Sequence, residues 1–190
     1  MTVAPPTLTT PRLALRPATE ADLDALWRLL TDPHVRRYLC DDQVLTRAEV
    51  QEMLAASIAQ WPAGMGFWIL RDREEKLLGC IGLHPVTAGI VAHAPDLAGE
   101  IEPTIALAPD CWGCGYAAEA LAAAVAHAFA TLGLEQLVAV VDEPNARSHR
   151  LMLRVGFTPT GTTTTGPCYP LRTYRLAKPA FDARSVPRPP

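Results

Sequence analysis

The feature that most constrains the fold is a succession of strand, loop, helix, strand, loop and helix between residues 100 and 156. The apolar segment EIEPTIALAPD is followed by the glycine-containing loop CWGCG and an alanine-rich segment whose helix is expected to end at Gly133. The β-branched segment EQLVAVVD then precedes a helix that begins at Asn145 and stops at Gly156. Strands alternating with helices in this way predict a sheet covered by helices.

Segments on either side supply further strands. Alternating apolar and polar residues predict a strand over 8–16, and residues 66–72 and 76–86 are typical of an antiparallel hairpin. A last hairpin is expected over 158–166 and 169–177. The sequence therefore predicts an α/β (mixed α+β) fold, with a mixed sheet of about seven strands and helices on both faces.

Two helices are expected before the first hairpin. The first begins at Thr19, with Asp22 three residues later as its capping partner, and the second begins with a capping box from Thr46 to Glu49. Residues 86–99 have no clear periodicity and are expected to be a loop.

The composition is that of one globular domain. Of 190 residues, 49% are hydrophobic and 19% charged, which is ordinary for a folded chain and unlike a disordered one. We expect a single domain over 8–178, an N-terminal tail over 1–7 and a proline-rich C-terminal tail over 179–190.

Charge and cysteine usage narrow the function classes. The net charge is −3 and no basic block is present, so neither nucleic acid nor an anionic membrane is an expected partner. No apolar run approaches the roughly 18 residues of a spanning helix, and the N-terminus does not resemble a secretory signal. Five scattered cysteines do not form a secreted disulfide framework, which predicts a cytoplasmic protein.

The loop CWGCG is the candidate binding site. Gly113 and Gly115 follow a strand directly and open a helix, whose first backbone N–H groups have no partner within the helix and attract anions such as phosphate. Such a loop can also be only a tight turn. A second alternative is redox chemistry, because Cys111 and Cys114 form a CxxC pair at a helix N-terminus. Zinc is disfavoured because no second cysteine pair exists.

Pro103 lies inside the strand that precedes this loop. A proline removes one donor from a strand ladder, so this strand is expected either to be bulged or to have a side left open for something other than a neighbouring strand.

The segment APDCWGCGYAAEAL resembles the acetyl-coenzyme A loop of the GNAT acetyltransferases. It is most similar to the branch of ribosomal-protein N-terminal acetyltransferases (RimJ/RimL-like), whose signature reads WGxGYAxEA. The resemblance continues in NARSHRLMLRVGF and at the front in LALRPATEADLDALWRLLTDPHVRRYL, and covers residues 8–176. It implies the GNAT fold, in which the fourth and fifth strands, predicted within EIEPTIALAPD and EQLVAVVD, splay apart and admit the pantetheine arm of the cofactor.

The resemblance also implies an activity. We expect an acetyl-CoA-dependent N-acetyltransferase that acetylates a primary amine by direct transfer, the acceptor being a protein or peptide α-amine or a small amine. A homodimer is possible in this family. The alternatives are an acyl-CoA-binding module that has lost catalysis and, less favoured, a CxxC thiol-disulfide oxidoreductase.

The resemblance assigns a set of cofactor-binding residues and no metal. Trp112 and Cys114 carry no charge, so the site is expected to depend on backbone N–H groups, with the oxyanion met by a backbone N–H near residues 105–107. The expected cofactor-binding residues are Ile105, Ala106, Leu107, Trp112, Gly113, Cys114, Gly115, Tyr116, Ala117, Ala118, Asn145 and Ser148.

Two residues are candidate catalytic groups. Glu102 occupies the place where this branch carries an acidic residue that faces the acceptor, so it is the candidate base, and Glu100 is its rival if the strand phase is shifted. Ser148 is the candidate partner of the cofactor sulfur, either as proton donor or only as a hydrogen-bond donor, because Met152 stands where other branches carry a tyrosine. Glu119 is expected only to favour the helix dipole.

Overall fold

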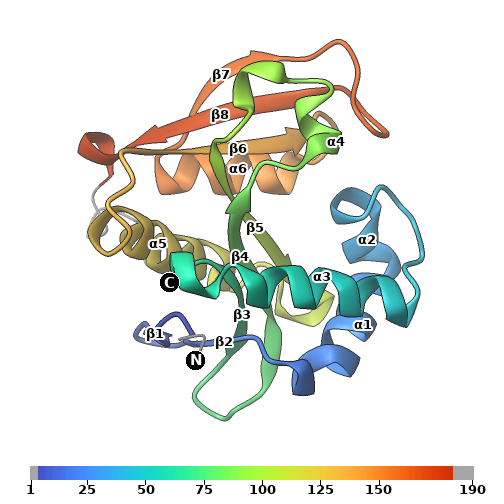
Figure 1. Cartoon of the computed structure of the whole chain (residues 1–190), viewed down its shortest axis with the longest axis vertical. Coiled ribbons are helices and arrows are strands. Elements are labelled where there is room, and N and C mark those ends of the chain that lie inside the picture. The colour runs from blue at the N-terminus through green and yellow to red at the C-terminus, as the bar shows by residue number, and fades with distance from the viewer. Residues whose placement is uncertain (1–3, 182–190) are drawn as a thin grey trace.

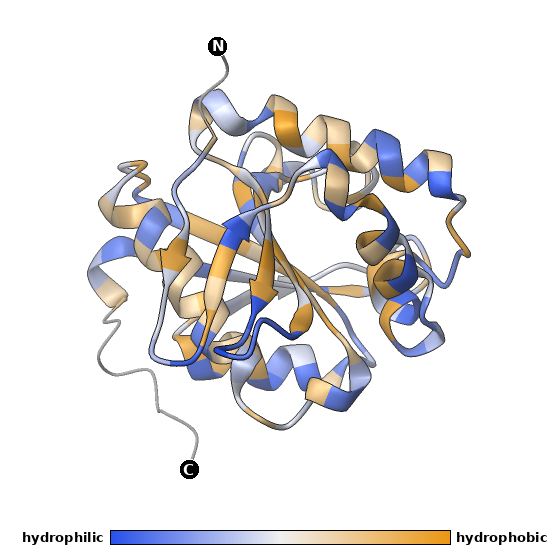
Figure 2. Cartoon of the chain, turned by 90° about the horizontal axis from the view of Figure 1, so that it is seen from below, coloured by the Kyte–Doolittle hydropathy of each residue, from blue (hydrophilic) through white to orange (hydrophobic). Residues whose placement is uncertain are grey.

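The computed structural model describes residues 4–181, which form two antiparallel sheets side by side with helices on both faces (Figure 1). Strands occupy the middle of the molecule and are largely hydrophobic, whereas the helices around them alternate hydrophobic and hydrophilic residues (Figure 2). The predicted fold class is confirmed, with one difference: the strands form two sheets rather than one mixed sheet.

The first sheet contains five strands in chain order. Each strand pairs with the next in an antiparallel ladder. The single strand predicted over 8–16 is wrong, because the chain turns back at residues 10–13 and makes two strands from that segment. The hairpin predicted over 66–86 is confirmed. The five strands are β1 (Leu8–Thr9), β2 (Ala14–Pro17), β3 (Gly66–Arg71), β4 (Leu77–Pro85) and β5 (Ile101–Leu107).

The second sheet contains the last three strands. β8 (Leu171–Ala177) lies between β6 (Gln136–Asp142) and β7 (Thr158–Thr162), and both pairings are antiparallel. Within residues 4–181 no ladder joins β5 to β6, although the two strands are neighbours. The expected divergence of the fourth and fifth predicted strands is therefore present.

Four helices come from the N-terminal half. α1 (Leu23–Thr31) follows a short 3-10 turn over Glu20–Asp22 at which the predicted Thr19 and Asp22 capping box is formed. α3 (Arg47–Ala59) begins at the predicted Thr46 and Glu49 box.

Two of those four helices were not predicted. α2 (Pro33–Leu39) starts where the Asp32 side chain accepts the His34 N–H at 2.8 Å. α4 (Ala88–Val91) and a 3-10 turn over Pro95–Leu97 interrupt the segment expected to be a loop.

The two remaining helices cover the opposite face. α5 (Tyr116–Ala130) packs against β4 and β5, and its row of alanines lets the backbones approach closely. α6 (Ala146–Val155) packs beside β6, with Asn145 as its N-cap and Gly156 as its C-cap, as predicted.

The expected tails fall only partly within the described residues. Lys178–Ala180 make a 3-10 turn and the ring of Phe181 packs on Phe129, while the rest of the predicted C-terminal tail lies outside. In the part of the chain that the structure describes, no helix is long and apolar enough to cross a membrane.

Candidate active site

A cleft of about 900 Å³ lies where the two sheets diverge. It is lined by residues of β5, the loop before α5, the end of β6 and the start of α6, together with residues of α1 and α2. Every predicted site residue except Cys114 lines this cleft, whereas the rival Glu100 does not. The fold thus brings together groups that are distant in the sequence, such as Glu102 and Ser148, which are 46 positions apart.

One wall of the cleft is the open edge of β5. The N–H of Ala108 donates to the carbonyl of Leu78, so even-numbered residues of this strand face β4. The N–H and C=O groups of Ile105 and Leu107 therefore face the open edge, and the backbone of Ala106 faces β4. Pro103 also lies on the open side and the β4 ladder has no register shift, so this proline removes no ladder bond. The strand was expected either to be bulged at Pro103 or to have an open side, and the structure shows the open side.

The glycine loop, residues 111–115, forms the next wall. Gly113 and Gly115 have φ of +80° and +78°, a left-handed backbone that favours glycine. The N–H of Glu119 is the first to bond back into α5, with the carbonyl of Gly115. Among the described residues, no group accepts a hydrogen bond from the backbone N–H groups of residues 113–118. These donors, at the positive end of a 15-residue helix, can bind an anion.

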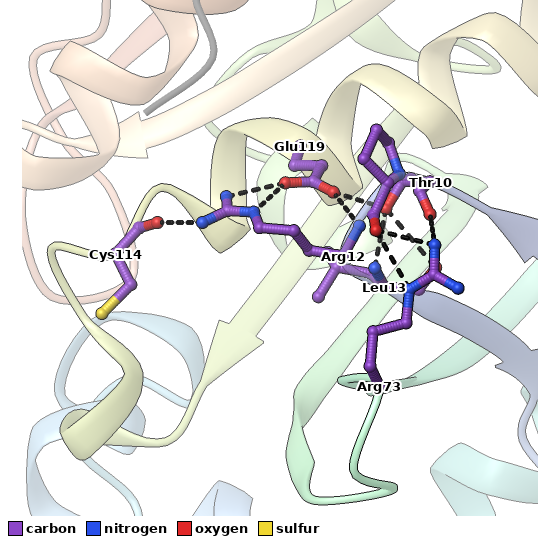
Figure 3. A network of polar contacts seen from close by, with 7 residues as sticks. Thr10, Arg12, Leu13, Arg73, Cys114 and Glu119 are labelled. Atoms are coloured by element: carbon purple, nitrogen blue, oxygen red, sulfur yellow. Dashed lines mark hydrogen bonds and ion pairs between the residues drawn. The ribbon is translucent and has the colours of Figure 1, made fainter. Parts of the chain in front are cut away.

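A network not predicted from the sequence fixes this loop from behind (Figure 3). The Glu119 carboxylate accepts the Arg12 Nε–H at 2.7 Å and the Thr10 hydroxyl at 2.6 Å. Arg12 in turn donates to the carbonyl of Cys114 at 2.9 Å and lies 4.6 Å from the centre of the Tyr116 ring. Glu119 therefore does more than favour the helix dipole: it orients the arginine that holds the loop.

The pKa of Glu119 agrees with this role. Burial by itself would raise the pKa of this carboxyl, but hydrogen bonds from Thr10 and Arg12 and the charge of Arg12 hold it below its usual value. Glu119 is thus ionised at neutral pH and anchors the turn between β1 and β2 to α5.

Arg147 places a positive charge beside Trp112 that was not expected from the sequence. The Trp112 indole N–H donates to the carbonyl of Leu107 at 2.8 Å, which fixes the ring against the open edge of β5. The Arg147 guanidinium of α6 lies 4.5 Å from the centre of this ring. The sequence shows only an uncharged tryptophan at this position, and its partner is 35 residues away.

Glu102 is a buried carboxyl that lines the cleft. It lies on β5 opposite His84 of β4, and only 7% of its surface is exposed. No described residue forms a hydrogen bond or ion pair with its side chain, and burial raises the pKa of Glu102 to about 7. A carboxyl with this pKa can exchange a proton near neutral pH.

The polar side chains of His84 and Glu100, which lie near Glu102, form hydrogen bonds or ion pairs with other groups. His84 Nε2 is 2.5 Å from the Thr104 hydroxyl and its Nδ1 is 3.0 Å from the carbonyl of Pro85, while burial lowers the pKa of His84. The rival Glu100 accepts the amide of Gln136 at 2.6 Å and forms an ion pair with Arg175 at 3.3 Å. Of the two glutamates, only Glu102 has an unengaged carboxyl in the cleft.

The start of α6 contributes Asn145 and Ser148. The Asn145 side chain accepts the backbone N–H of Ser148 at 3.2 Å and so caps the helix. Both residues line the cleft and are half-buried.

Sequence reasoning missed a second buried carboxyl in the cleft. Asp142, the last residue of β6, is 8% exposed and lines the same cleft. Burial, together with the charge of Asp41, raises the pKa of Asp142 to about 6. The only sequence signal was an acidic residue at the end of an apolar strand, which is also typical of a turn.

The cysteines do not form a redox centre of the usual kind. Cys111 is buried and its thiol lies 3.3 Å from an Asp110 carboxylate oxygen, and burial with this neighbouring carboxylate raises the pKa of Cys111 to about 11. Reactive CxxC cysteines have a depressed pKa. All five cysteines are free. Within residues 4–181, no group of histidine, cysteine and carboxylate side chains could hold a metal ion.

Known proteins share this architecture. The family model described as Acetyltransferase (GNAT) domain matches residues 12–158. The chain is 29% identical over 181 residues to the N-acetyltransferase YoaA of Bacillus subtilis (strain 168), which covers 92% of this chain and 98% of YoaA.

Solved structures agree with the family match. An acetyltransferase from Agrobacterium tumefaciens str. C58 is 25% identical with a TM-score of 0.76, over 94% of this chain and 98% of that chain. RimL, the ribosomal L7/L12 α-N-protein acetyltransferase solved with coenzyme A, is 17% identical with a TM-score of 0.72, over 90% and 98%, and so shares the fold. Because the family model spans most of the sequence and the fold agrees with it, the protein belongs to the GNAT acetyltransferase family.

Proposed function

We propose that this protein transfers an acetyl group from acetyl-CoA to a primary amine, directly and without a covalent enzyme intermediate. The observation that carries the proposal is that one cleft combines unpaired backbone donors at residues 113–118, the open edge of β5 and the unengaged Glu102 carboxyl. Family membership gives the type of reaction, and these groups supply what the reaction needs.

The chain has groups suited to each part of the cosubstrate. The N–H groups of residues 113–118 would bind the pyrophosphate, with Arg147 as a nearby positive charge. The N–H and C=O of Ile105, at the open edge of β5, would bind the pantetheine amides as an added strand would. Acetyl-CoA supplies the acetyl group as a thioester, which is reactive toward an uncharged amine.

Glu102 is assigned to accept the proton of the amine, and Ser148 to donate a hydrogen bond to the cosubstrate sulfur. An amine is protonated near neutral pH and becomes a nucleophile only after it loses a proton, and Glu102 accepts that proton directly or through water. Its pKa of about 7 suits this exchange. The Ser148 hydroxyl lines the same cleft and would donate a hydrogen bond to the sulfur of the bound cosubstrate.

Finer assignments stay predictions. Membership of the RimJ/RimL branch, a protein α-amine as acceptor and a homodimer derive from the resemblance in the sequence, whereas a cytoplasmic location derives from the cysteine usage and the N-terminal residues. RimL supports only the shared fold at its level of identity.

The test begins with calorimetric titration of the whole chain with acetyl-CoA, followed by thiol release with a panel of amines. We expect saturable binding and turnover with at least one amine. Glu102→Gln should lower turnover at least tenfold with acetyl-CoA affinity unchanged, as for removal of a general base. Glu100→Gln is the matched control and should retain turnover within about twofold, because this residue lies outside the cleft.

The other outcomes are distinct. No binding of acetyl-CoA would overturn the proposal. Binding without thiol release from any amine would favour an acyl-CoA-binding module that lacks catalysis. Equal turnover by wild type and Glu102→Gln would dismiss Glu102 as the base.

A further inference from the structure

The cleft contains one buried carboxyl, that of Asp142, that the proposed reaction does not use. Asp142 is more than nine-tenths buried, and no described residue donates a hydrogen bond to its carboxylate or pairs with it. Its backbone carbonyl accepts the N–H of Asn145 at 2.9 Å. A buried ionised carboxylate without a partner is costly, so a group that pairs with it there gains an interaction at a site already removed from bulk water.

The strand places Asp142 on the face away from α5 and α6. Alternate residues of β6 share a face, so Asp142 lies on the side of Val138 and Val140. Those two valines pack against Val86, Ile90 and other residues of the segment that carries α4. Ile90 and Thr87 of that segment also line the cleft. Asp142 therefore faces the part of the cleft opposite the helices that supply the loop donors.

A second acidic residue reinforces this position. Asp41, at the end of α2, lines the cleft and lies close enough that its charge contributes to the raised pKa of Asp142. Its backbone is held at φ +52°, and its carbonyl accepts the Cys168 thiol at 3.4 Å.

The nearest arginines of α2 do not neutralise this pair. Arg36 forms an ion pair with Asp42 at 2.7 Å, and Arg37 lies 5.2 Å from the centre of the Tyr38 ring. Within residues 4–181, neither arginine forms an ion pair with Asp41 or Asp142. The cleft therefore has a negative position distinct from Glu102, to which a cation would be attracted.

We propose that Asp142, together with Asp41, binds a second positively charged group of the acceptor, so that the preferred substrates are diamines in which one amine reacts and the other stays protonated. This inference rests on the proposed function. It assigns Glu102 to the reacting amine and Asp142 to recognition of the second amine, which explains why two buried carboxyls without partners line one cleft.

The experiment compares diamines with monoamines of equal chain length, using acetyl-CoA and thiol release. Putrescine is paired with n-butylamine, and cadaverine with n-pentylamine. Wild type should use the better diamine with a kcat/KM at least about tenfold above that of its monoamine, as expected for a buried charge pair. Asp142→Asn should reduce this ratio to near one, mainly by raising KM for the diamine.

Asp96→Asn is the matched control, since this aspartate is exposed on the 3-10 turn after α4 and lies outside the cleft lining. It should leave both activities and their ratio unchanged. Asp41→Asn provides a second variant if Asp142→Asn does not fold, and should lower the ratio by a smaller factor.

Each result is decisive. Equal use of diamine and monoamine by wild type would overturn the inference while leaving acetyl transfer intact. A loss of kcat for both acceptors in Asp142→Asn, with the ratio preserved, would also overturn it, because Asp142 would then act on the reacting amine. Absence of thiol release with every amine would instead be a failure of the proposed function.

Discussion

The two sides of the cleft offer binding groups of opposite kinds. At the glycine loop the groups are backbone N–H donors of residues 113–118, which remain available whatever side chains the loop carries. On the acceptor side the groups are the carboxylates of Glu102 and Asp142, which are buried and unpaired. In the proposed reaction, phosphate would therefore be bound by the backbone and the amine by particular side chains. Single substitutions should therefore affect the two sides in different ways.

The two sides also differ in what maintains them. The loop depends on a left-handed backbone at two glycines and on Arg12 and Glu119 behind it. The acceptor side depends on the cleft between β5 and β6, in which Glu102 and Asp142 are buried and no described residue pairs with them. The first is a local arrangement and the second is a consequence of the whole sheet.

The largest effect on acetyl-CoA affinity is expected from a substitution that obstructs the loop. Gly115→Glu places a negative side chain among the phosphate donors and strains a residue at φ +78°, so acetyl-CoA affinity should fall by about 100-fold or more. The measurement is calorimetric titration. Gly133→Glu is the control, because Gly133 has a similar φ of +71° and open space around it but lies outside the cleft lining. Equal loss in both variants would mean that strain, rather than the loop, is responsible.

The next largest effect is on the free energy of unfolding, and it tests whether the Glu102 carboxyl on the acceptor side is buried without a partner. Burial raises the pKa of Glu102 from its ordinary 4.5 to about 7, so the folded state takes up a proton between these pH values. The contribution of Glu102 to the free energy of unfolding therefore falls as the pH rises through this window. Glu102→Gln should be more stable than wild type at pH 8 by about 1 to 3 kcal/mol, and nearly equal at pH 4.

Urea unfolding at the two pH values measures this difference. Glu52→Gln, at an exposed position of α3, is the control and should change stability little at either pH. A gain from Glu102→Gln that is the same at pH 4 and pH 8 would contradict the prediction, since it could not come from ionisation.

The smallest effect tests the support behind the loop. Arg12→Leu removes the hydrogen bond to the Cys114 carbonyl and the partner of Glu119, so acetyl-CoA affinity should fall by about three- to tenfold, without the loss seen for Gly115→Glu. Arg47→Leu, which removes only an exposed ion pair with Asp24, should leave affinity unchanged. An unchanged affinity in Arg12→Leu would show that the backbone holds the loop alone.

Features governed by local rules could be predicted from the sequence. The Thr46 and Glu49 capping box, the start of α6 at Asn145 and the glycine loop all follow from residues a few positions apart. The helix α2 was not predicted, although Asp32 followed by Pro33 is a recognisable helix start. The split of the first strand was missed because one alternating pattern extended over a turn.

The sequence by itself determined the order of most strands and of the helices α1, α3, α5 and α6, the loop that precedes α5 and the family, since these depend on short-range patterns of residues. Only the tertiary structure decided that Glu102 is unengaged while Glu100 pairs with Arg175, that Glu119 orients the arginine bonded to the loop, and that Asp142 shares the cleft. The physical reason is that burial and pairing depend on residues distant in the chain. Arg12 and Glu119 are 107 positions apart, and no local pattern encodes their contact.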